Sequence, residues 1–294
     1  MQITGPTTSR ALASPRSRRL DRSLQRGARK GGFYVILCLV FGLFLLPLFW
    51  MVLSAIKPPG LVSAYPPVWI FAPSFDNFVE VLQGQDLLLE LLHSALIGIA
   101  AVGIGLFLGL PAAYSIARHR QQRLATLLLV TRMVPFFACL IPMYLVFKAV
   151  GLTNSLIGIA ISHLVITVPL TVWIMIGFFE DVPRELEEAA AIDGASRIGS
   201  FWRIGLPLVT PGIVAAAVLN FIFSWNNFQM ALVLGGVDTK TAPLAVLAYT
   251  GTDSPMDWGG MAASATVVVL PTFFFVLFVQ RYLVKGLTMG GLKG

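Results

Sequence analysis

The chain has 294 residues, of which 56% are hydrophobic and only 12% are charged. Soluble globular proteins carry about 25% charged residues, so a soluble chain of this composition would lack the polar side chains to cover its surface. The formal net charge of +7 would suit a nucleic-acid-binding protein, but the basic residues are spread over several segments in a way typical of membrane proteins. We therefore expect an integral membrane protein that does not bind nucleic acid.

The N-terminal segment differs in composition from the rest. Residues 1–32 are rich in Ser, Arg and Gly and contain almost no apolar run, which is typical of disordered segments. A cleaved signal peptide does not fit, because its apolar core spans about 7–15 residues and the apolar segment here is far longer. We expect a disordered basic cytoplasmic tail whose stretch Arg16–Lys30 lies against anionic lipid.

Six long apolar segments follow. A spanning helix needs about 20 mainly apolar residues, because the hydrocarbon layer is about 30 Å thick and each residue rises about 1.5 Å. The segments that meet this test are Phe33–Ile56, His93–Ala117, Leu124–Val150, Ser155–Phe179, Leu208–Leu234 and Met261–Val279. Their continuity argues against barrel strands, which alternate polar and apolar residues. The sequence predicts an all-α polytopic membrane protein with six transmembrane helices within residues 33–284.

The positions of Lys and Arg predict the orientation, because basic residues favour cytoplasmic loops. With the N-terminus inside, the cytoplasmic segments are 1–32, 118–123, 180–207 and the tail from Gln280. These segments hold 17 of the 21 basic residues, and the outside segments hold only Lys57, Lys148 and Lys240. We therefore expect both termini in the cytoplasm, with residues 285–294 as a C-terminal cytoplasmic tail.

The cytoplasmic connection 180–207 is long and has a helical pattern of its own. Asp181 is a good N-cap and Pro183 fits a first turn. Gly194 is placed to end the helix. Leu186, Ala189 and Ala190 fall on one narrow face of mostly small side chains.

A second short helix is expected after this one, capped by Ser196 and running through Trp202, with Pro207 at the start of the fifth span. The connection fits an interfacial amphipathic helix poorly, because its apolar face is small and its acidic residues would meet an anionic leaflet. We expect a helix that docks onto another protein.

At this point the sequence resembles a known family. Glu188, Ala189, Ala190, Gly194, Ile204, Leu206 and Pro207 reproduce the E-A-A-x3-G-x9-I-x-L-P signature of ABC importer permeases. The segments Ser224–Phe228 and Gly286–Gly294 also resemble the smaller, six-span permease of the carbohydrate (maltose-type) group, although that group commonly has an acid where Asn227 stands. The resemblance covers nearly the whole chain and implies a type I importer-like permease with a cytoplasmic coupling helix.

The resemblance implies partners and residue roles. The permease would sit in the bacterial cytoplasmic (inner) membrane with a second homologous permease, two ATPase subunits and an extracytoplasmic substrate-binding protein, and it would carry a sugar, oligosaccharide or polyol by alternating access. Glu188 would make a polar contact with the ATPase, Ala189 and Ala190 the close-fitting face, and Gly194 the turn. Ile204, Leu206 and Pro207 would fix the loop onto the fifth span. Gly290, Gly291 and Lys293 would lie in a tail that reaches between the ATPases.

The chain has no pattern of a catalytic centre. The phosphate-binding motif G-x-x-x-x-G-K-[ST] is absent from the sequence, so ATP and Mg would be bound by the partner ATPase. His93, His119 and His163 have no paired spacing that would suit a metal, and Cys38 and Cys139 both lie in apolar runs. We expect no bound cofactor, no metal site and no enzyme activity in this chain.

Polar residues inside the spans are candidates for the translocation pathway, because they are costly in lipid. Arg132 is the charged residue that lies well inside a predicted span. It would line the pathway, pair with another subunit or extend its guanidinium toward the membrane surface. Asn220, Trp225 and Asn227 mark the fifth span, where Asn220 and Asn227 would share a helix face; interhelical bonding is equally open. Gly98, Gly103, Gly105 and Gly109 suggest a close-packing face on the second span.

Two other functions fit the sequence less well than an importer permease does. An ion-coupled secondary transporter acting alone usually has intramembrane acids, and the six predicted spans contain no Asp or Glu. A non-transporting membrane scaffold would leave the signature in 180–207 without a role. Both alternatives are therefore less consistent with the sequence.

Overall fold

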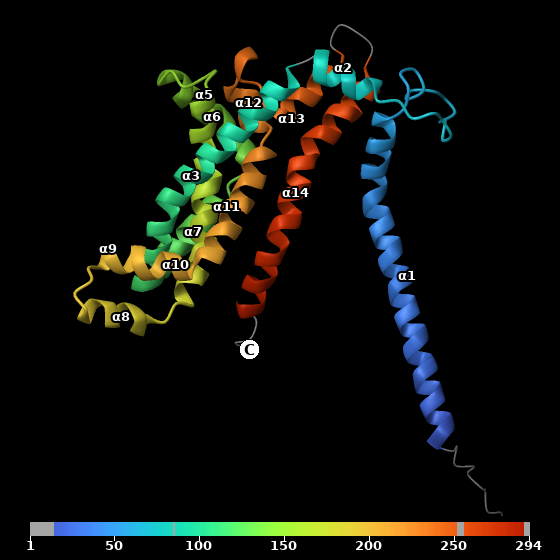
Figure 1. Ribbon diagram of the computed structural model, residues 1–294. Coiled ribbons are helices and arrows are strands. Elements are labelled where there is room, and N and C mark those ends of the chain that lie inside the picture. The colour runs from blue at the N-terminus through green and yellow to red at the C-terminus, as the bar shows by residue number, and fades with distance from the viewer. Residues whose placement is uncertain (1–14, 85, 252–255, 291–294) are drawn as a thin grey trace, which may run out of the picture. The chain divides into compact units, whose positions relative to one another are not determined.

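The computed structural model describes residues 15–84, 86–251 and 256–290. All regular elements within these ranges are helices (Figure 1). The chain divides into two parts, one that ends at Met51 and one that begins at Val52. Most of α1 (Pro15–Ala55) forms the first part, and α2 to α14 belong to the second.

Helix α1 begins well before the apolar segment. Residues 15–32, expected to be disordered, are helical, so that expectation is wrong for this stretch. Leu, Arg, Gln and Ala in the stretch are good helix formers, and the next proline inside the helix is Pro47. Nothing therefore stops the helix from running into the apolar portion Lys30–Ala55, whose best window has a mean hydropathy of 2.8. Residues 1–14 lie outside the described ranges.

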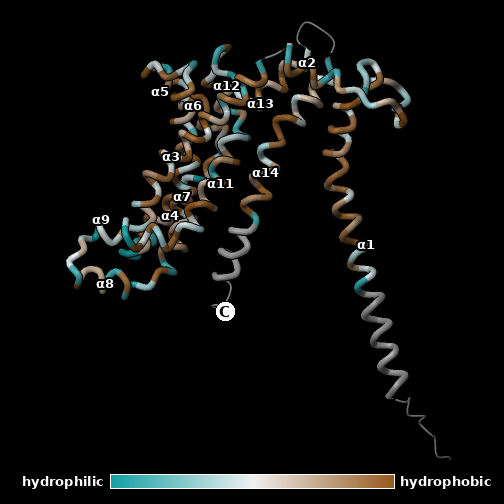
Figure 2. Tube along the Cα trace, in the orientation of Figure 1, coloured by the Kyte–Doolittle hydropathy of each residue, from teal (hydrophilic) through white to brown (hydrophobic). Residues whose placement is uncertain are grey.

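The centre of the second part is built from three helices: α3 (Leu87–His119), α7 (Leu164–Glu180) and α11 (Thr210–Trp225). Hydrophobic residues run along this bundle, and hydrophilic residues gather at the end that carries α8 and α9 (Figure 2). Helix α3 begins earlier than the predicted second span, so Glu90 lies in its first turn and is buried. Glu90 lies outside the predicted span His93–Ala117, which holds no carboxylate.

Glycines on α3 allow close helix approach. A Cβ added at Gly109 would lie 2.6 Å from Cγ2 of Thr171, and one at Gly105 would lie 2.7 Å from Oγ1 of Thr167. Gly98 likewise lies against the ring of Phe221 on α11. Small residues let backbones pack closely where lipid supplies no hydrophobic drive. The predicted packing face is confirmed at these three glycines and wrong at Gly103, which has open space around it.

Several predicted spans are broken into shorter helices. The third is divided into α4 (Gln122–Thr131) and α5 (Phe136–Ala149), and the fourth into α6 (Leu156–Ser162) and α7, which are bent by 41°. The fifth is divided into α10 (Leu206–Leu208), α11 and α12 (Gln229–Leu234). Within the described residues, three helices are long and apolar enough to cross a membrane, or up to five if each bent pair is one span.

The end of the bundle opposite α8 and α9 carries the short helices α2 (Asp76–Gly84), α12 and α13 (Ala242–Ala245), and the 3₁₀ turns Val237–Thr239 (η2) and Val246–Tyr249 (η3). Ser94 on α3 accepts a hydrogen bond from the backbone N–H of Ala242 at 2.8 Å, and His93 Nδ1 lies 3.0 Å from the carbonyl oxygen of Lys240. These bonds fix the connection before α14 (Trp258–Gly290) onto the start of α3.

Candidate functional site

The connection 180–207 projects from one end of the bundle as two short helical arms, α8 (Arg184–Ile192) and α9 (Arg197–Ser200) with its continuation (Figure 1). Asp181, expected as the N-cap of the first arm, instead caps the C-terminal end of α7, where its N–H donates to the carbonyl of Gly177 at 3.1 Å. That expectation is wrong because Pro183 disfavours helical geometry at Val182, the residue before it, and α8 begins only after this proline.

Gly194 ends α8, as predicted. Its φ angle is +85°, which glycine adopts with little cost. The N–H of Ala195 donates to the carbonyl of Ala190 at 2.8 Å, and the N–H of Gly194 donates to that of Ala191 at 3.1 Å. These two bonds form a Schellman motif. The reversal of the chain between the two arms therefore depends on Gly194.

The second arm is longer than the sequence predicted. Ser196 caps α9 as expected, since its Oγ accepts from the N–H of Gly199 at 3.1 Å. The helix does not stop at Trp202, however, but continues as a π-helical turn, η1 (Phe201–Gly205), and then as α10. A π turn inserts an extra residue into a helix and often lies at a functional site.

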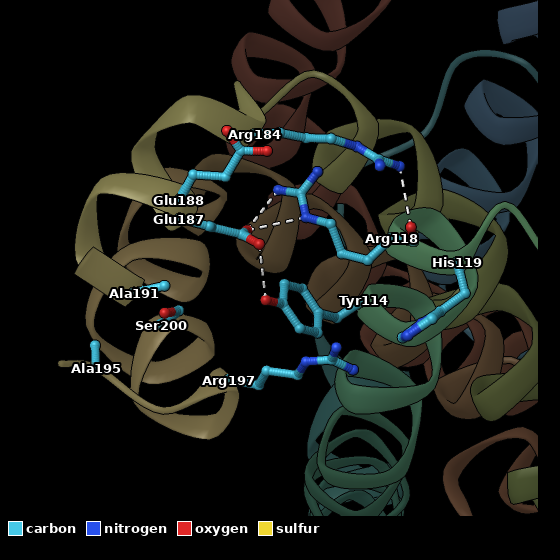
Figure 3. Close-up of a pocket in the computed structure, with 10 residues that line it drawn as sticks. All are labelled: Tyr114, Arg118, His119, Arg184, Glu187, Glu188, Ala191, Ala195, Arg197 and Ser200. Atoms are coloured by element: carbon cyan, nitrogen blue, oxygen red, sulfur yellow. Dashed lines mark hydrogen bonds and ion pairs between the residues drawn. The ribbon is translucent and has the colours of Figure 1, made fainter. Parts of the chain in front are cut away.

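An ion pair joins the first arm to the end of α3. Nε and Nη2 of Arg118 lie 2.9 Å and 2.6 Å from Oε1 of Glu187, and the hydroxyl of Tyr114 donates to Oε2 of Glu187 at 2.9 Å (Figure 3). The side chains of Arg118 and Glu187 are only 11% and 15% exposed, so solvent screens the pair less than an ordinary surface ion pair. Both oxygens of Glu187 are thus engaged by residues of α3.

An aromatic cluster joins the second arm to the same helix end. The ring centroid of Tyr114 lies 5.0 Å from that of Phe201 and 5.4 Å from that of Phe179 on α7. Phe201 is buried, whereas Leu206 and Ile204 are half-buried and Pro207 is exposed. Phe201 therefore attaches this arm to the bundle more deeply than the three signature residues expected to do so.

A cavity of about 360 Å³ lies between the two arms and the end of α3. Its lining residues are Tyr114, Arg118, His119, Arg184, Glu187, Glu188, Ala191, Ala195, Arg197 and Ser200. The ion pair of Arg118 and Glu187 lies at this cavity (Figure 3).

The remaining signature residues of α8 are exposed or half-buried. Glu188 and Ala189 are exposed, and Ala190 is half-buried. Leu186 and Ile192 are exposed to 44% and 87%, and together with Ala189 they follow one another at intervals of three residues. This gives α8 an exposed apolar stripe with a small residue at its centre.

Sequence reasoning did not identify Glu187, Tyr114, Arg118 or Phe201. A Tyr and an Arg four residues apart lie on one face of a helix, and this spacing at the basic end of the second span was the available signal for Tyr114 and Arg118. Glu187 was one of several neighbouring acids, and nothing local distinguished it.

The candidate pathway residues of the fifth span are buried and bonded within the chain. Nδ2 of Asn220 donates to Thr171 Oγ1 at 2.8 Å, and the indole N–H of Trp225 donates to the carbonyl of Val268 at 3.1 Å. Because α11 ends at Trp225, Asn227 does not share a helix face with Asn220 as expected. Its side-chain oxygen instead accepts from the N–H of Met230 at the start of α12.

Arg132 lies in the break between α4 and α5. Its side chain is exposed, and its guanidinium carbon lies 6.0 Å from the centroid of the Phe223 ring. Of the predicted tail residues, Gly290 is the last residue of α14, and Gly291 and Lys293 lie outside the described residues. The helix thus reaches past residue 285, where the tail was expected to begin.

Comparison with known proteins gives a consistent result. The family model described as binding-protein-dependent transport system inner membrane component matches residues 101–289. The chain is 34% identical over 278 residues to the trehalose transport system permease protein SugB of Mycobacterium tuberculosis (strain CDC 1551 / Oshkosh), covering 91% of this chain and 100% of that protein. It is 28% identical over 253 residues to the diacetylchitobiose uptake system permease protein DasC of Streptomyces coelicolor (strain ATCC BAA-471 / A3(2) / M145), covering 84% and 91%.

The fold resembles that of a chain in the crystal structure of a bacterial ABC transporter involved in the import of the acidic polysaccharide alginate. The TM-score is 0.70 at 20% sequence identity, over 95% of this chain and 99% of that chain. The family match and the identity to the curated relatives confirm the resemblance inferred from the signature. The chain therefore belongs to the family of binding-protein-dependent transport system inner membrane components, the multi-pass permeases of ABC importers whose ATPase is a separate subunit.

Proposed function

We propose that this chain is one of two homologous permease subunits that together carry a sugar, oligosaccharide or polyol across the inner membrane. The names of its relatives support this substrate class, since they include trehalose, diacetylchitobiose and trehalose/maltose permeases. Two ATPase subunits and a periplasmic substrate-binding protein complete the proposed complex, and ATP and Mg bind to the ATPases alone.

In this proposal the chain spans the membrane six times, with α4 and α5 forming one broken span. Both termini lie in the cytoplasm, as does the end of the bundle that carries α8 and α9. The distribution of basic residues supports this orientation, because segments 118–123 and 180–207 hold six of them and basic residues favour the cytoplasmic side.

Helix α8 is the coupling helix in this proposal. The observation that carries it is the shape of α8: a short helix, fixed at its end by the Schellman motif at Gly194, with an exposed stripe of Leu186, Ala189 and Ile192. Ala189 and Ala190 would allow the close approach of an ATPase cleft, and Glu188 would make a polar contact at its edge. Ile204, Leu206 and Pro207 would hold the second arm to the fifth span, with Gly290, Gly291 and Lys293 between the ATPases.

The opposite end of the bundle would receive the binding protein. The predicted outside segments 57–92 and 235–260 contain seven Asp or Glu residues, including Glu80 and Asp257 near the start of α14. An acidic surface favours a partner with basic residues, chiefly through the rate and orientation of encounter. Arg132, Trp225 and Asn227 would contribute to the pathway between the two ends, and Asn220 would support it through its bond to Thr171.

Purification and transport measurements test the proposal. A tagged chain expressed with the genes around it should elute with an ATPase and a second permease. The complex in proteoliposomes should take up a labelled sugar or polyol only when ATP and the binding protein are supplied. Uptake by the chain alone, driven by an ion gradient, would contradict the proposal and support a secondary transporter. Elution of the chain without an ATPase or a second permease would also contradict it.

A further inference from the structure

We infer that Arg118 and Tyr114, at the end of α3, are positioning residues for coupling: they hold Glu187 so that a movement of α8 reaches the membrane helices through α3. This inference rests on the proposed function of α8. It gives a role in coupling to two residues outside the signature. It also states that motion passes from α8 to α3 through hydrogen bonds between the two helices, as well as along the covalent chain.

The first argument is that α8 has no apolar attachment to the bundle. None of its residues is buried. Every side-chain hydrogen bond that joins α8 to another described element ends on Tyr114 or Arg118, because Glu187 bonds both and Arg184 donates to the backbone carbonyl of Arg118 at 3.0 Å. Within the described residues, the side-chain bonds of α8 therefore converge on the last turns of α3.

The second argument is that the chain changes direction at both ends of α8. Pro183 precedes the helix and Gly194, with its positive φ, follows it. Helix α8 is therefore not continuous with α7 or α9, and the contact with α3 links it to the bundle in addition to the backbone. Two nitrogen atoms of the planar guanidinium of Arg118 bind the same oxygen of Glu187, Oε1, while Tyr114 binds the other oxygen. Three charge-assisted hydrogen bonds from α3 thus hold this carboxylate.

The third argument is the place of α3 in the bundle. Its glycines bring α7 and α11 into close contact, as at Gly105 with Thr167 and Gly98 with Phe221. A displacement of the α3 end therefore cannot be absorbed locally and would be passed to these helices, because close-packed interiors deform little.

Tyr114 connects both arms to this helix end. Its hydroxyl donates to Glu187 on α8, and its ring packs against Phe201 of the second arm. Arg118 also reaches the carbonyl of Val182, before α8, through Nη1 at 3.2 Å. Three successive pieces of the connection thus meet on two residues of α3.

The test uses the whole complex in proteoliposomes and measures sugar taken up per ATP hydrolysed in the presence of loaded binding protein. We expect Arg118→Ala to lower this ratio about tenfold, as the loss of a hydrogen-bonded charged contact would predict. Arg118→Lys should restore only part of it, because one ammonium nitrogen cannot replace the two guanidinium nitrogens that bond Oε1 of Glu187. Tyr114→Phe keeps the ring packing and should give a smaller decrease, which guards against an effect of misfolding.

Arg197→Ala is the matched control. Arg197 lines the same cavity, and its side chain makes no hydrogen bond or ion pair with another described residue, so its truncation should leave the ratio unchanged. Recovery of the ratio in the double variant Arg118→Glu with Glu187→Arg would add support, since only a direct contact is restored by exchanging its charges.

The possible outcomes separate the two proposals. If Arg118→Ala and Tyr114→Phe both assemble with the ATPase and keep the wild-type ratio, the positioning role is wrong while the proposed function stands. If the wild-type chain itself neither assembles with an ATPase nor takes up sugar with one, the proposed function fails first.

Discussion

Helices α7 and α8 follow one another in the chain but are held in opposite ways. Helix α7 buries seven of its residues against α3 and α11, among them Thr167 and Thr171 beneath the glycines of α3. Helix α8 buries none and is attached through the bonds of Glu187. Helix α7 is held by its neighbours along its length, whereas α8 is held to α3 by hydrogen bonds of two side chains. This difference is suited to a protein that must convert motion at its edge into motion of its interior.

The largest effect should come from breaking the end of α8. Replacing Gly194 by Val puts a β-branched residue at a φ of +85°, which such residues avoid and which costs about 1–2 kcal/mol or more. We expect the Schellman turn to open and the ATPase stimulation by loaded binding protein to be lost, with membrane insertion intact. Stimulated ATP hydrolysis in proteoliposomes measures the effect.

The matched control is Gly177→Val on α7, where nothing lies within 4 Å of an added Cβ and φ is not positive. This variant should keep most of the stimulation. Equal stimulation by the Gly194 variant and the wild type would show that the shape of α8 is not needed for coupling.

The next effect should come from the interior. Gly109→Val would force a side chain against Thr171, whose Cγ2 lies 2.6 Å from the added Cβ, and overpacking of this kind costs about 1–3 kcal/mol. We expect a lower unfolding temperature of the purified complex in detergent, measured by tryptophan fluorescence. Gly103→Val, with open space around the Cβ, is the control. An equal decrease of the unfolding temperature in both variants would show that the contact of Gly109 with Thr171 does not determine the stability.

A smaller effect is expected at Asn220. Its bond to Thr171 joins α11 to α7 at 2.8 Å, and hydrogen bonds between membrane helices contribute about 0.6 kcal/mol on average. Asn220→Ala should therefore lower the unfolding temperature slightly while the preference among sugars stays the same. Competition assays with a panel of labelled sugars measure that preference. A changed preference would place Asn220 on the substrate path in addition to its packing role.

The smallest effect on stability is expected at Arg132. Its side chain is exposed, and its interaction with the Phe223 ring at 6.0 Å is worth about 0.5–1 kcal/mol at an exposed site. Arg132→Ala should leave the unfolding temperature nearly unchanged and slow uptake severalfold, as expected for a residue of the pathway. Uptake at the wild-type rate would return Arg132 to a structural role.

The sequence was sufficient where a local signal determines the structure. Gly194 and Ser196 were assigned correctly because a positive φ and a side-chain cap are properties of single residues and their neighbours. The helical class and the packing role of Gly105 and Gly109 were also predictable, since apolar run length and small-residue spacing carry that information.

The remaining features depend on contacts between distant segments. The choice of Glu187 as the bonded carboxylate depends on where α3 ends relative to α8, and adjacent residues of a helix point about 100° apart. The breaks at Arg132 and near Asn227 were hidden because the apolar composition is continuous across them. Phe201 was not recognised because its partners, Tyr114 and Phe179, come from two other helices.

The π turn at Phe201–Gly205 has a geometric consequence for the second arm. One surplus residue in a helix offsets everything before it by about 100° relative to an unbroken spiral. The direction in which the side chains of Arg197 and Ile198 point around the helix axis therefore depends on this one inserted residue. It does not depend on the sequence of α9 itself. Deleting one residue from this turn would swing α9 by roughly a quarter of a revolution while shortening the helix by only about 1.5 Å.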